Sequence, residues 1–316
     1  MNINLIENNI SLADKNWFKT GGSARYFAQP RTQQEFQQAL QFTHEHNVAI
    51  FVLGSGANIL ISDEGFDGLV IRPALNELSY TIIDENNAFV TAGAGVTMDQ
   101  LIEYCLSHQL GGLEEFSGIP GTVGGSVYIN LHYFQFLLSQ FLVTATVIDS
   151  ANNSVHTVDN AWFNFGYDYS TLHAETYYLI DATFKVKRLF PLDVAFARGR
   201  RTEIMRHRFN RYPTSHTCGS FFRNFLPAEI VHEKTGVKLP YVAYYLDKIG
   251  VKGSLRIGDA AVSHQHANMI VNKGSATSTQ IIELAQKMQD LVHNEFNLLP
   301  QPECRLIGFK EYPLKK

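Results

Sequence analysis

Three glycine-rich segments of the chain have the residue types that bind anions through backbone groups. They are Gly54-Ser55-Gly56-Ala57-Asn58, Gly93-Ala94-Gly95 and the stretch 117–126, and the first two follow runs of apolar residues. Because glycine has no Cβ, successive N–H groups of such a loop can converge on a phosphate. A tight turn explains any one of them equally well, since neither the full Rossmann spacing nor a Walker lysine is present. Together they favour a phosphate-bearing ligand such as a nucleotide.

Two further polar residues stand where proton chemistry is possible. Ser220 lies in Cys218-Gly219-Ser220-Phe221-Phe222, where two bulky apolar residues could keep its hydroxyl dry. The segment is not a nucleophile elbow, and a turn serine that caps backbone is the alternative interpretation. Glu303 precedes a short apolar strand and lies near Arg305, so an ion pair at a strand end would also explain it.

Charged residues occur in two other unusual settings. Asp168 stands among four aromatic residues in the stretch FNFGYDYS, residues 163–170, which by composition indicates an exposed turn. Six arginines cluster at positions 198, 200, 201, 206, 208 and 211. A cluster of guanidinium groups could bind a diphosphate or a 2′-phosphate. The alternative interpretation is that the arginines cover the solvent-exposed face of a helix.

Composition limits the classes of protein to consider. With 316 residues the chain is long enough for about two domains, or three lobes. Its 26 Lys and Arg against 30 Asp and Glu give a net charge of −4, which gives no reason to expect nucleic acid or an anionic membrane as partner. The first residues lack a basic, apolar leader pattern, and the most apolar stretch is about half a membrane span. We expect a cytoplasmic protein without membrane insertion.

No metal site is expected. The cysteines at 105, 218 and 304 have no CxxC spacing, which also argues against a disulfide framework. The His-x-His pairs at 44/46 and 264/266 have no third ligand at a suitable spacing.

The hydrophobic pattern predicts a mixed α and β chain. Helices are predicted over 31–47, 98–108, 192–210 and after the capping-box sequence at 277–280, and strands over 48–53, 69–71, 88–92, 142–149, 155–158 and 177–186.

Seven motifs in this order resemble one enzyme family. They are KNWFKTGGSARYF (15–27), LGSGANILISDEGFDGLVIR (53–72), TAGAGV (91–96), SGIPGTVGGSVYIN (117–130), GSFFRN (219–224), AAVSHQHANMIVNKGSAT (260–277) and PECRLIG (302–308). The chain thereby resembles the UDP-N-acetylenolpyruvoylglucosamine reductases, the MurB family, over most of its length.

The resemblance implies a fold and a cofactor. The fold is α+β, an FAD-binding fold of the vanillyl-alcohol oxidase type with two α+β lobes, here 1–72 and 73–205, and a C-terminal α+β substrate lobe, 206–316. FAD would contact two sets of residues: Gly54, Ser55, Gly56, Ala57 and Asn58 at its pyrophosphate, and Gly118, Ile119, Pro120, Gly121, Thr122, Gly125 and Ser126 elsewhere.

The resemblance also implies a reaction and two catalytic residues. NADPH would be the reductant, and hydride would pass by way of FAD to the enolpyruvyl group of UDP-N-acetylglucosamine enolpyruvate, giving UDP-N-acetylmuramate. Ser220 would donate the proton and Glu303 would assist polarisation. A flavoprotein oxidoreductase of this kind serves peptidoglycan synthesis, and with it cell wall biogenesis, cell shape and cell division. The only partner implied is the small sugar nucleotide, and we expect a monomer.

The chain departs from the family at three places. The family motif F-G-Y-R-x-S carries an arginine that pairs with the substrate carboxylate, and Asp168 occupies its position here. The family pattern N-[AI]-G-A-Y-G reads Asn130-Leu131-His132-Tyr133-Phe134-Gln135, and the segment 225–245 is longer and more aromatic than usual. Replacing the cation by an anion reverses the sign of its interaction with a developing enolate. At an effective dielectric constant of about 20, the interaction of a unit charge with an enolate about 4 Å away amounts to about 4 kcal/mol.

Two interpretations follow from these departures. In the first, the chain is an active reductase in which another cation, such as an arginine of 198–211, replaces the missing one. In the second, it is a divergent FAD-binding homologue with lost or altered activity because Asp168 replaces the expected arginine.

Overall fold

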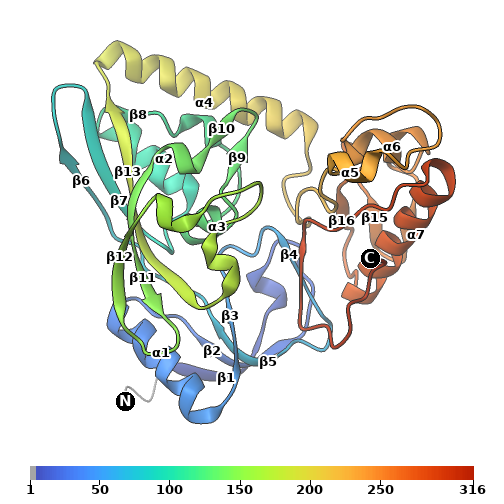
Figure 1. The fold of residues 1–316 in the computed structure, drawn as a ribbon, viewed down its shortest axis with the longest axis horizontal. Helices are drawn as coiled ribbons and strands as arrows, with labels where there is room; N and C mark the ends of the chain where they lie inside the picture. Colours follow the sequence, from blue (N-terminus) through green and yellow to red (C-terminus); the bar gives the residue numbers. More distant parts are fainter. Residues whose placement is uncertain (1–4) are drawn as a thin grey trace. The chain divides into compact units, whose positions relative to one another are not determined.

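The computed structural model describes residues 5–316, which form two compact units (Figure 1). Of the described residues, unit 1 comprises 5–8, 26–55 and 68–208, and unit 2 comprises 9–25, 56–67 and 209–316. Residues 1–4 lie outside the described residues. They are the start of the predicted first lobe and of the N-terminal stretch that lacks a leader pattern. The division into three lobes stays a prediction.

The larger sheet of unit 1 has the strand order β12-β11-β13-β7-β6, and β8 also pairs with β13. The strands are β6 (Leu78–Ile82), β7 (Asn87–Gly93), β8 (Leu110–Gly111), β11 (Leu142–Asp149), β12 (Val155–Asp159) and β13 (Tyr177–Arg188). All neighbours are antiparallel. Buried and less buried residues alternate along β7 and β13, so Val90 and Phe184, which are paired in register, both enter the core. The sheet-rich middle of the chain is confirmed.

Three helices of unit 1 are α2 (Met98–Ser107), α3 (Val123–Tyr128) and α4 (Pro191–Arg211). Thr97 and Gln100 form a capping box at the start of α2, which buries Leu101 and Ile102. Directly after α3 the short hairpin of β9 (His132–Tyr133) and β10 (Phe136–Leu137) follows.

A four-stranded sheet has the order β1-β2-β5-β3. Its strands are β1 (Ile6–Ser11), β2 (Ser23–Ala28), β3 (Ala49–Val52) and β5 (Phe66–Ile71), and β3 runs parallel to β5. The predicted first helix is α1 (Gln33–His46), which begins after the N-cap Thr32. Its residues Phe36 and Leu40, one turn apart, are fully buried.

Unit 2 has its own core of buried aromatic and aliphatic side chains, with Phe221, Phe222, Tyr245 and Met288 among them. Its elements are β4 (Ile59–Ile61) parallel to β17 (Arg305–Ile307), the antiparallel sheet β14 (Arg256–Ile257), β15 (Ala260–Val262) and β16 (Ile270–Asn272), and the helices α5 (Pro227–Ile230), α6 (Val242–Lys248) and α7 (Ser278–Phe296). The α+β class expected from the sequence is confirmed. Among residues 5–316, none of the helices combines the length and hydrophobicity that a bilayer span requires.

The long aromatic segment 225–245 is an ordered part of this core. The Tyr245 hydroxyl donates to the Val237 carbonyl at 2.7 Å and accepts from the Leu239 N–H at 3.0 Å. Phe225 packs edge-on against the Tyr245 ring. The added length is therefore folded around one buried tyrosine.

Candidate active site

The second and third glycine-rich segments lie side by side in unit 1. The Gly124 N–H donates to the Ala94 carbonyl at 3.0 Å, and the Val123 N–H donates to the Val96 carbonyl at 2.8 Å. A Cβ on Gly124 would approach the Ala94 carbonyl to 3.1 Å. The absence of a side chain thus lets these two backbones contact each other.

The first glycine-rich segment adjoins the third through Gly54. A Cβ at Gly54 would lie 2.7 Å from the Thr122 hydroxyl, too close for any real side chain. Thr122 is the N-cap of α3 and accepts a hydrogen bond from the Gly125 N–H at 3.3 Å. Gly54, at the start of the first glycine-rich segment, therefore lies against the third segment within unit 1.

Gly56 has a different reason to be glycine. Its φ of +66° lies in the left-handed region, and a Cβ there would stand 2.6 Å from the Asn16 Cα and 2.7 Å from the Lys15 carbonyl oxygen. Either feature alone excludes a larger residue. The loop conformation at 54–58 is fixed by backbone packing.

The residues of this loop fit the pyrophosphate of FAD. Within residues 5–316, the N–H groups of Gly56, Ala57 and Asn58 donate to no protein acceptor. The buried side-chain oxygen of Asn58 also has no hydrogen-bond partner in this part of the chain. Buried polar groups are almost always paired, so a ligand with phosphate and hydroxyl groups would complete both sets.

The other predicted cofactor residues surround the start of α3. Gly118 and Gly125 are exposed, Ile119, Pro120 and Gly121 are half-buried, and Thr122 and Ser126 are buried. The φ of Gly118 is +73°, and its carbonyl accepts from the Arg208 Nε at 3.1 Å. Sequence reasoning did not single out Arg208 as a neighbour of this segment, because the contact joins residues 90 positions apart.

Ser220 and Glu303 come from adjacent backbone segments of unit 2. The Phe221 carbonyl accepts from the Glu303 N–H at 2.9 Å, and Phe222 forms a β-bridge with Pro302. Two residues that the sequence placed in separate motifs are thus brought onto neighbouring segments.

Asn268 fixes the serine segment from its other side. Its carbonyl accepts from the Phe221 N–H at 2.8 Å, and its buried side chain both accepts from the Phe222 N–H at 3.1 Å and donates to the Phe222 carbonyl at 2.7 Å. Asn268 lies within the motif AAVSHQHANMIVNKGSAT, but no role was predicted for it from the sequence. Its signal was a polar residue within an apolar run, which has to find buried partners.

The Ser220 side chain is half-buried and follows Gly219, whose φ is +81°. Within residues 5–316 its hydroxyl has no hydrogen-bond partner. No hydrogen bond from this hydroxyl to backbone is present there, so the alternative of a capping turn serine gains no support from the structure. A hydroxyl held on a rigid segment without an internal partner can exchange a proton with a ligand.

The cysteines next to these residues are structural. Cys218 and Cys304 are buried in the core of unit 2. Burial, with the Cys218 thiol as a neighbour, raises the pKa of the Cys304 thiol well above its usual value. A protonated, buried thiol is neither a nucleophile nor a metal ligand.

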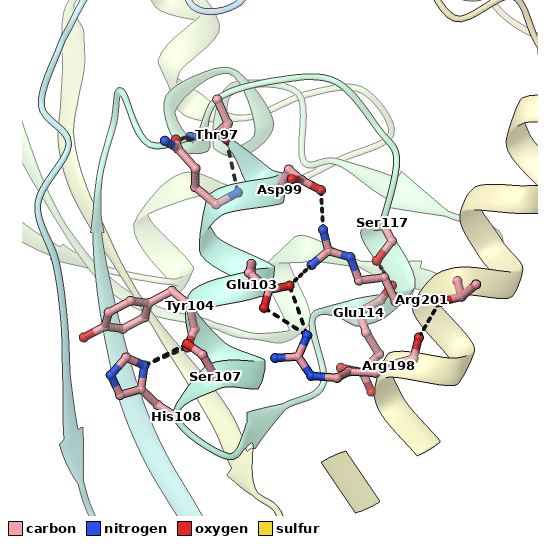
Figure 2. A network of polar contacts seen from close by, with 12 residues as sticks. Thr97, Asp99, Glu103, Tyr104, Ser107, His108, Glu114, Ser117, Arg198 and Arg201 are labelled. Carbon is pink, nitrogen blue, oxygen red and sulfur yellow. Dashed lines mark hydrogen bonds and ion pairs between the residues drawn. The ribbon is translucent and has the colours of Figure 1, made fainter. Parts of the chain in front are cut away.

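Three arginines of the α4 cluster bind carboxylates from other elements, and Figure 2 shows two of them, Arg198 and Arg201. Arg201 contacts Asp99 at 2.7 Å and Glu103 at 2.9 Å, and Arg198 contacts Glu103 at 2.9 Å. Arg200 makes two hydrogen bonds, of 2.8 and 2.9 Å, with Glu115. These three guanidinium groups attach α4 to α2 and to the loop that follows α2. Their ion pairs explain these arginines without a bound diphosphate.

Asp168 is not the surface acid that composition suggested. It lies in a turn closed by the Gly166–Tyr169 bridge, with φ of +49°, yet only 22% of its side chain is exposed. Its Oδ1 is 3.5 Å from Nδ1 of His132. Burial raises the pKa of Asp168, and the nearby His132 opposes part of that rise. The prediction of a turn here was correct, and the prediction that the acid is exposed was wrong.

Neither His-x-His pair is part of a metal site in the described residues. No group of three or more His, Cys, Asp or Glu side chains within 5–316 could hold a metal ion. Burial, together with the charges of Arg211 and Lys252, lowers the pKa of His266 to about 4. His266 is therefore a neutral, packed histidine at neutral pH.

Comparison with known proteins agrees with this geometry. Residues 24–159 match the FAD binding domain family, and residues 211–307 match the family of the C-terminal domain of UDP-N-acetylenolpyruvoylglucosamine reductase. A UDP-N-acetylenolpyruvoylglucosamine reductase of Trichormus variabilis is 33% identical over 92% of this chain and 83% of its own length. One of Clostridium novyi is 29% identical over 96% of this chain and 92% of its own.

A solved structure extends the likeness to the fold. The UDP-N-acetylenolpyruvylglucosamine reductase of Thermus caldophilus superposes with a TM-score of 0.76 at 26% identity, over 96% of this chain and 98% of its own. Sequence and fold agree along nearly the whole length, and the chain belongs to the UDP-N-acetylenolpyruvoylglucosamine reductase family.

Proposed function

We propose that this chain reduces the enolpyruvyl group of UDP-N-acetylglucosamine enolpyruvate in an FAD-dependent reaction that gives UDP-N-acetylmuramate. The observation that carries the proposal is the pairing of the Ser220 segment with the Glu303 segment in a family member that keeps all three glycine-rich loops. NADPH is the proposed reductant.

The glycine-rich loops are the proposed cofactor site. Gly54 to Asn58 hold the pyrophosphate of FAD through their N–H groups, and the segment from Gly118 to Ser126 supplies further backbone contacts. When bound there, FAD supplies the hydride-transfer chemistry. The protein contributes orientation and electrostatics.

Ser220 is the proposed proton donor. Hydride addition to the β-carbon of the enolpyruvyl group leaves negative charge on the α-carbon and the adjacent carboxylate, and the α-carbon needs a proton. A serine hydroxyl is a weak acid, so it donates only because the enolate beside it is strongly basic. Its half-buried position keeps competing water away from that proton.

Glu303 is the proposed polarising residue. Its backbone N–H donates to the Phe221 carbonyl, which holds residue 303 beside the serine segment. A carboxyl group there assists charge redistribution at the acceptor and the return of a proton to the serine.

The proposed reaction sets the cellular setting. It serves peptidoglycan synthesis, and therefore cell wall biogenesis, cell shape and cell division. The proposed location is the cytoplasm and the proposed state a monomer with lobes 1–72, 73–205 and 206–316.

The second candidate, a divergent flavoprotein with lost or altered activity, rests on the acid at 168. It predicts that Asp168→Arg gains reductase activity over the wild type. A wild type that turns over normally, with no gain in that variant, excludes it.

The test is steady-state NADPH oxidation by FAD-loaded protein with and without the enolpyruvyl sugar nucleotide. Substrate-dependent oxidation is expected, and Ser220→Ala should lower kcat about 10²- to 10⁴-fold with unchanged FAD content. Ser215→Ala is the matched control, since Ser215 is an exposed serine of the same loop. A fully FAD-loaded wild type without turnover refutes the proposed reaction.

A further inference from the structure

Two of the three places where the chain departs from its family contact each other in unit 1. The Asn130 side chain donates to the Gly166 carbonyl at 3.1 Å. The buried Ser170 hydroxyl donates to the Tyr128 carbonyl at 2.7 Å. The end of α3 and the turn at 166–169 are therefore tied together at both ends of that turn.

The two changed side chains lie beside each other. His132, at the position of a family glycine, and Asp168, at the position of the family arginine, lie 3.5 Å apart between Nδ1 and Oδ1. The Tyr167 ring is tilted over His132 at 5.1 Å between centroids. The two substitutions make a single unit, each with the other as its partner.

The geometry gives the two residues different roles. Asp168 holds the Nδ1 side of the imidazole, so Nε2 is directed away from that carboxylate, and 32% of the His132 side chain is exposed. The second Asp168 oxygen is buried without a hydrogen-bond partner within residues 5–316. A buried carboxylate so poorly solvated needs a neighbouring positive charge, and an imidazolium supplies it.

The pair also lies close in sequence to the proposed cofactor segment. The N-cap of α3 is Thr122, and His132 begins the strand β9 soon after that helix ends. Among the arginines of 198–211, those at 198, 200 and 201 are held by carboxylates, and Arg208 donates to the Gly118 carbonyl. His132 is a further group that this region can offer to an anionic acceptor.

We propose that His132, as an imidazolium oriented by Asp168, binds the carboxylate of the acceptor through its Nε2–H in place of the missing guanidinium. This inference rests on the proposed function. His132 is then a substrate-binding residue that also stabilises the developing negative charge, and Asp168 is a positioning residue that acts through it.

Other charged and titratable groups also lie around the hairpin. Tyr133 follows His132, and the Arg208 guanidinium lies 5.9 Å from its ring. The 3₁₀ turn that packs on β9 carries Glu114 and Glu115, and Glu115 is bound by Arg200. Tyr167 is the remaining titratable neighbour. Asp168 is thus the only group in ion-pair contact with the imidazole within residues 5–316.

The sign of the pH dependence follows. An imidazole carries positive charge only when it is protonated, so its attraction for an anion is lost as pH rises. Affinity for an anionic ligand should therefore fall with rising pH in the wild type. Without His132 this limb of the profile should disappear.

The experiment measures the affinity for UDP-N-acetylmuramate by calorimetry and kcat/KM for the enolpyruvyl substrate, both from pH 6 to 9. His132→Gln should weaken product binding and lower kcat/KM about 10- to 100-fold at pH 6.5 and should flatten both profiles. Asp168→Asn should also weaken product binding and lower kcat/KM, by a smaller factor. The product affinity and kcat/KM of the double variant should be no lower than those of His132→Gln, because Asp168 acts through the imidazole.

His156→Gln is the matched control, since His156 is exposed on β12 and bonded to the Ser154 hydroxyl at 2.7 Å. Melting temperature and FAD content verify that each variant is folded. Product affinity within twofold of wild type in His132→Gln, with the pH limb retained, overturns the proposal, as does an additive double variant. A wild type that binds product with the predicted pH dependence yet shows no turnover refutes the proposed reaction and leaves the role of His132 standing.

Discussion

At the scale of single residues, Asp168 shows a conflict between stability and function. Its carboxyl group is partly buried, has one oxygen without a partner in the described chain, and has a pKa raised by that burial despite the nearby His132. A folded-state pKa above the unfolded value means that ionisation destabilises the fold. The ordinary reason to keep such an acid is a role outside stability.

Asp168→Asn should therefore stabilise the protein while it impairs the reaction. Asparagine also accepts the left-handed backbone at this position. The gain in unfolding free energy, on the order of 1 kcal/mol, should be present at pH 8 and should vanish as pH falls through the raised pKa of the wild-type acid. Urea unfolding at pH 8 and pH 4 measures it, and a variant less stable than wild type at pH 8 would refute the account.

At the scale of elements, the start of α7 has two caps. Thr277 closes the capping box with Gln280, as the sequence predicted. Asp63, from a distant loop of unit 2, accepts from the Ser278 N–H at 2.8 Å and the Thr279 N–H at 3.0 Å. Burial raises the pKa of Asp63, but these hydrogen bonds outweigh it and leave the pKa below its usual value. The helix thereby gains a charged cap that local sequence does not reveal.

Asp63→Ala should lower the free energy of unfolding by about 1–2 kcal/mol at neutral pH. Because the folded-state pKa of this acid is lowered, its contribution is present above the ordinary carboxyl value and is lost as pH falls through the folded value. Asp67→Ala is the control, with an expected effect below about 0.5 kcal/mol, since Asp67 is 86% exposed. Chemical unfolding at pH 7 and at pH 3 measures this difference in unfolding free energy. An equal loss of stability at the two pH values would contradict the charged cap.

Helices and strands with a strong apolar period were predictable, and contacts between distant turns were not. The periodicity gave α1 and α7 within a few residues, because each buries one continuous face. The pairing of His132 with Asp168 depends on Asn130, Phe134 and Asp168 in left-handed conformations. No local pattern predicts three non-glycine residues there, because tertiary packing imposes those conformations.

At the scale of the whole molecule, each unit has its own buried cluster. The order of motifs predicted the α+β FAD-binding fold, and in unit 1 the second and third glycine-rich segments contact each other while Gly54 lies against Thr122. The pairing of the segments that carry Ser220 and Glu303 could not be read from spacing, because a β-bridge between remote loops creates it. The resemblance implies their roles, and the hydrogen bond from the Glu303 N–H to the Phe221 carbonyl holds the two segments side by side.

The most direct test of the central claim is an anaerobic single turnover. Protein loaded with FAD is reduced with one equivalent of NADPH and then mixed with UDP-N-acetylglucosamine enolpyruvate. The account predicts return of the oxidised flavin absorbance at about 450 nm, with one equivalent of UDP-N-acetylmuramate formed per flavin. A reduced flavin that stays reduced after the substrate is added, in protein shown to bind that substrate, would contradict it.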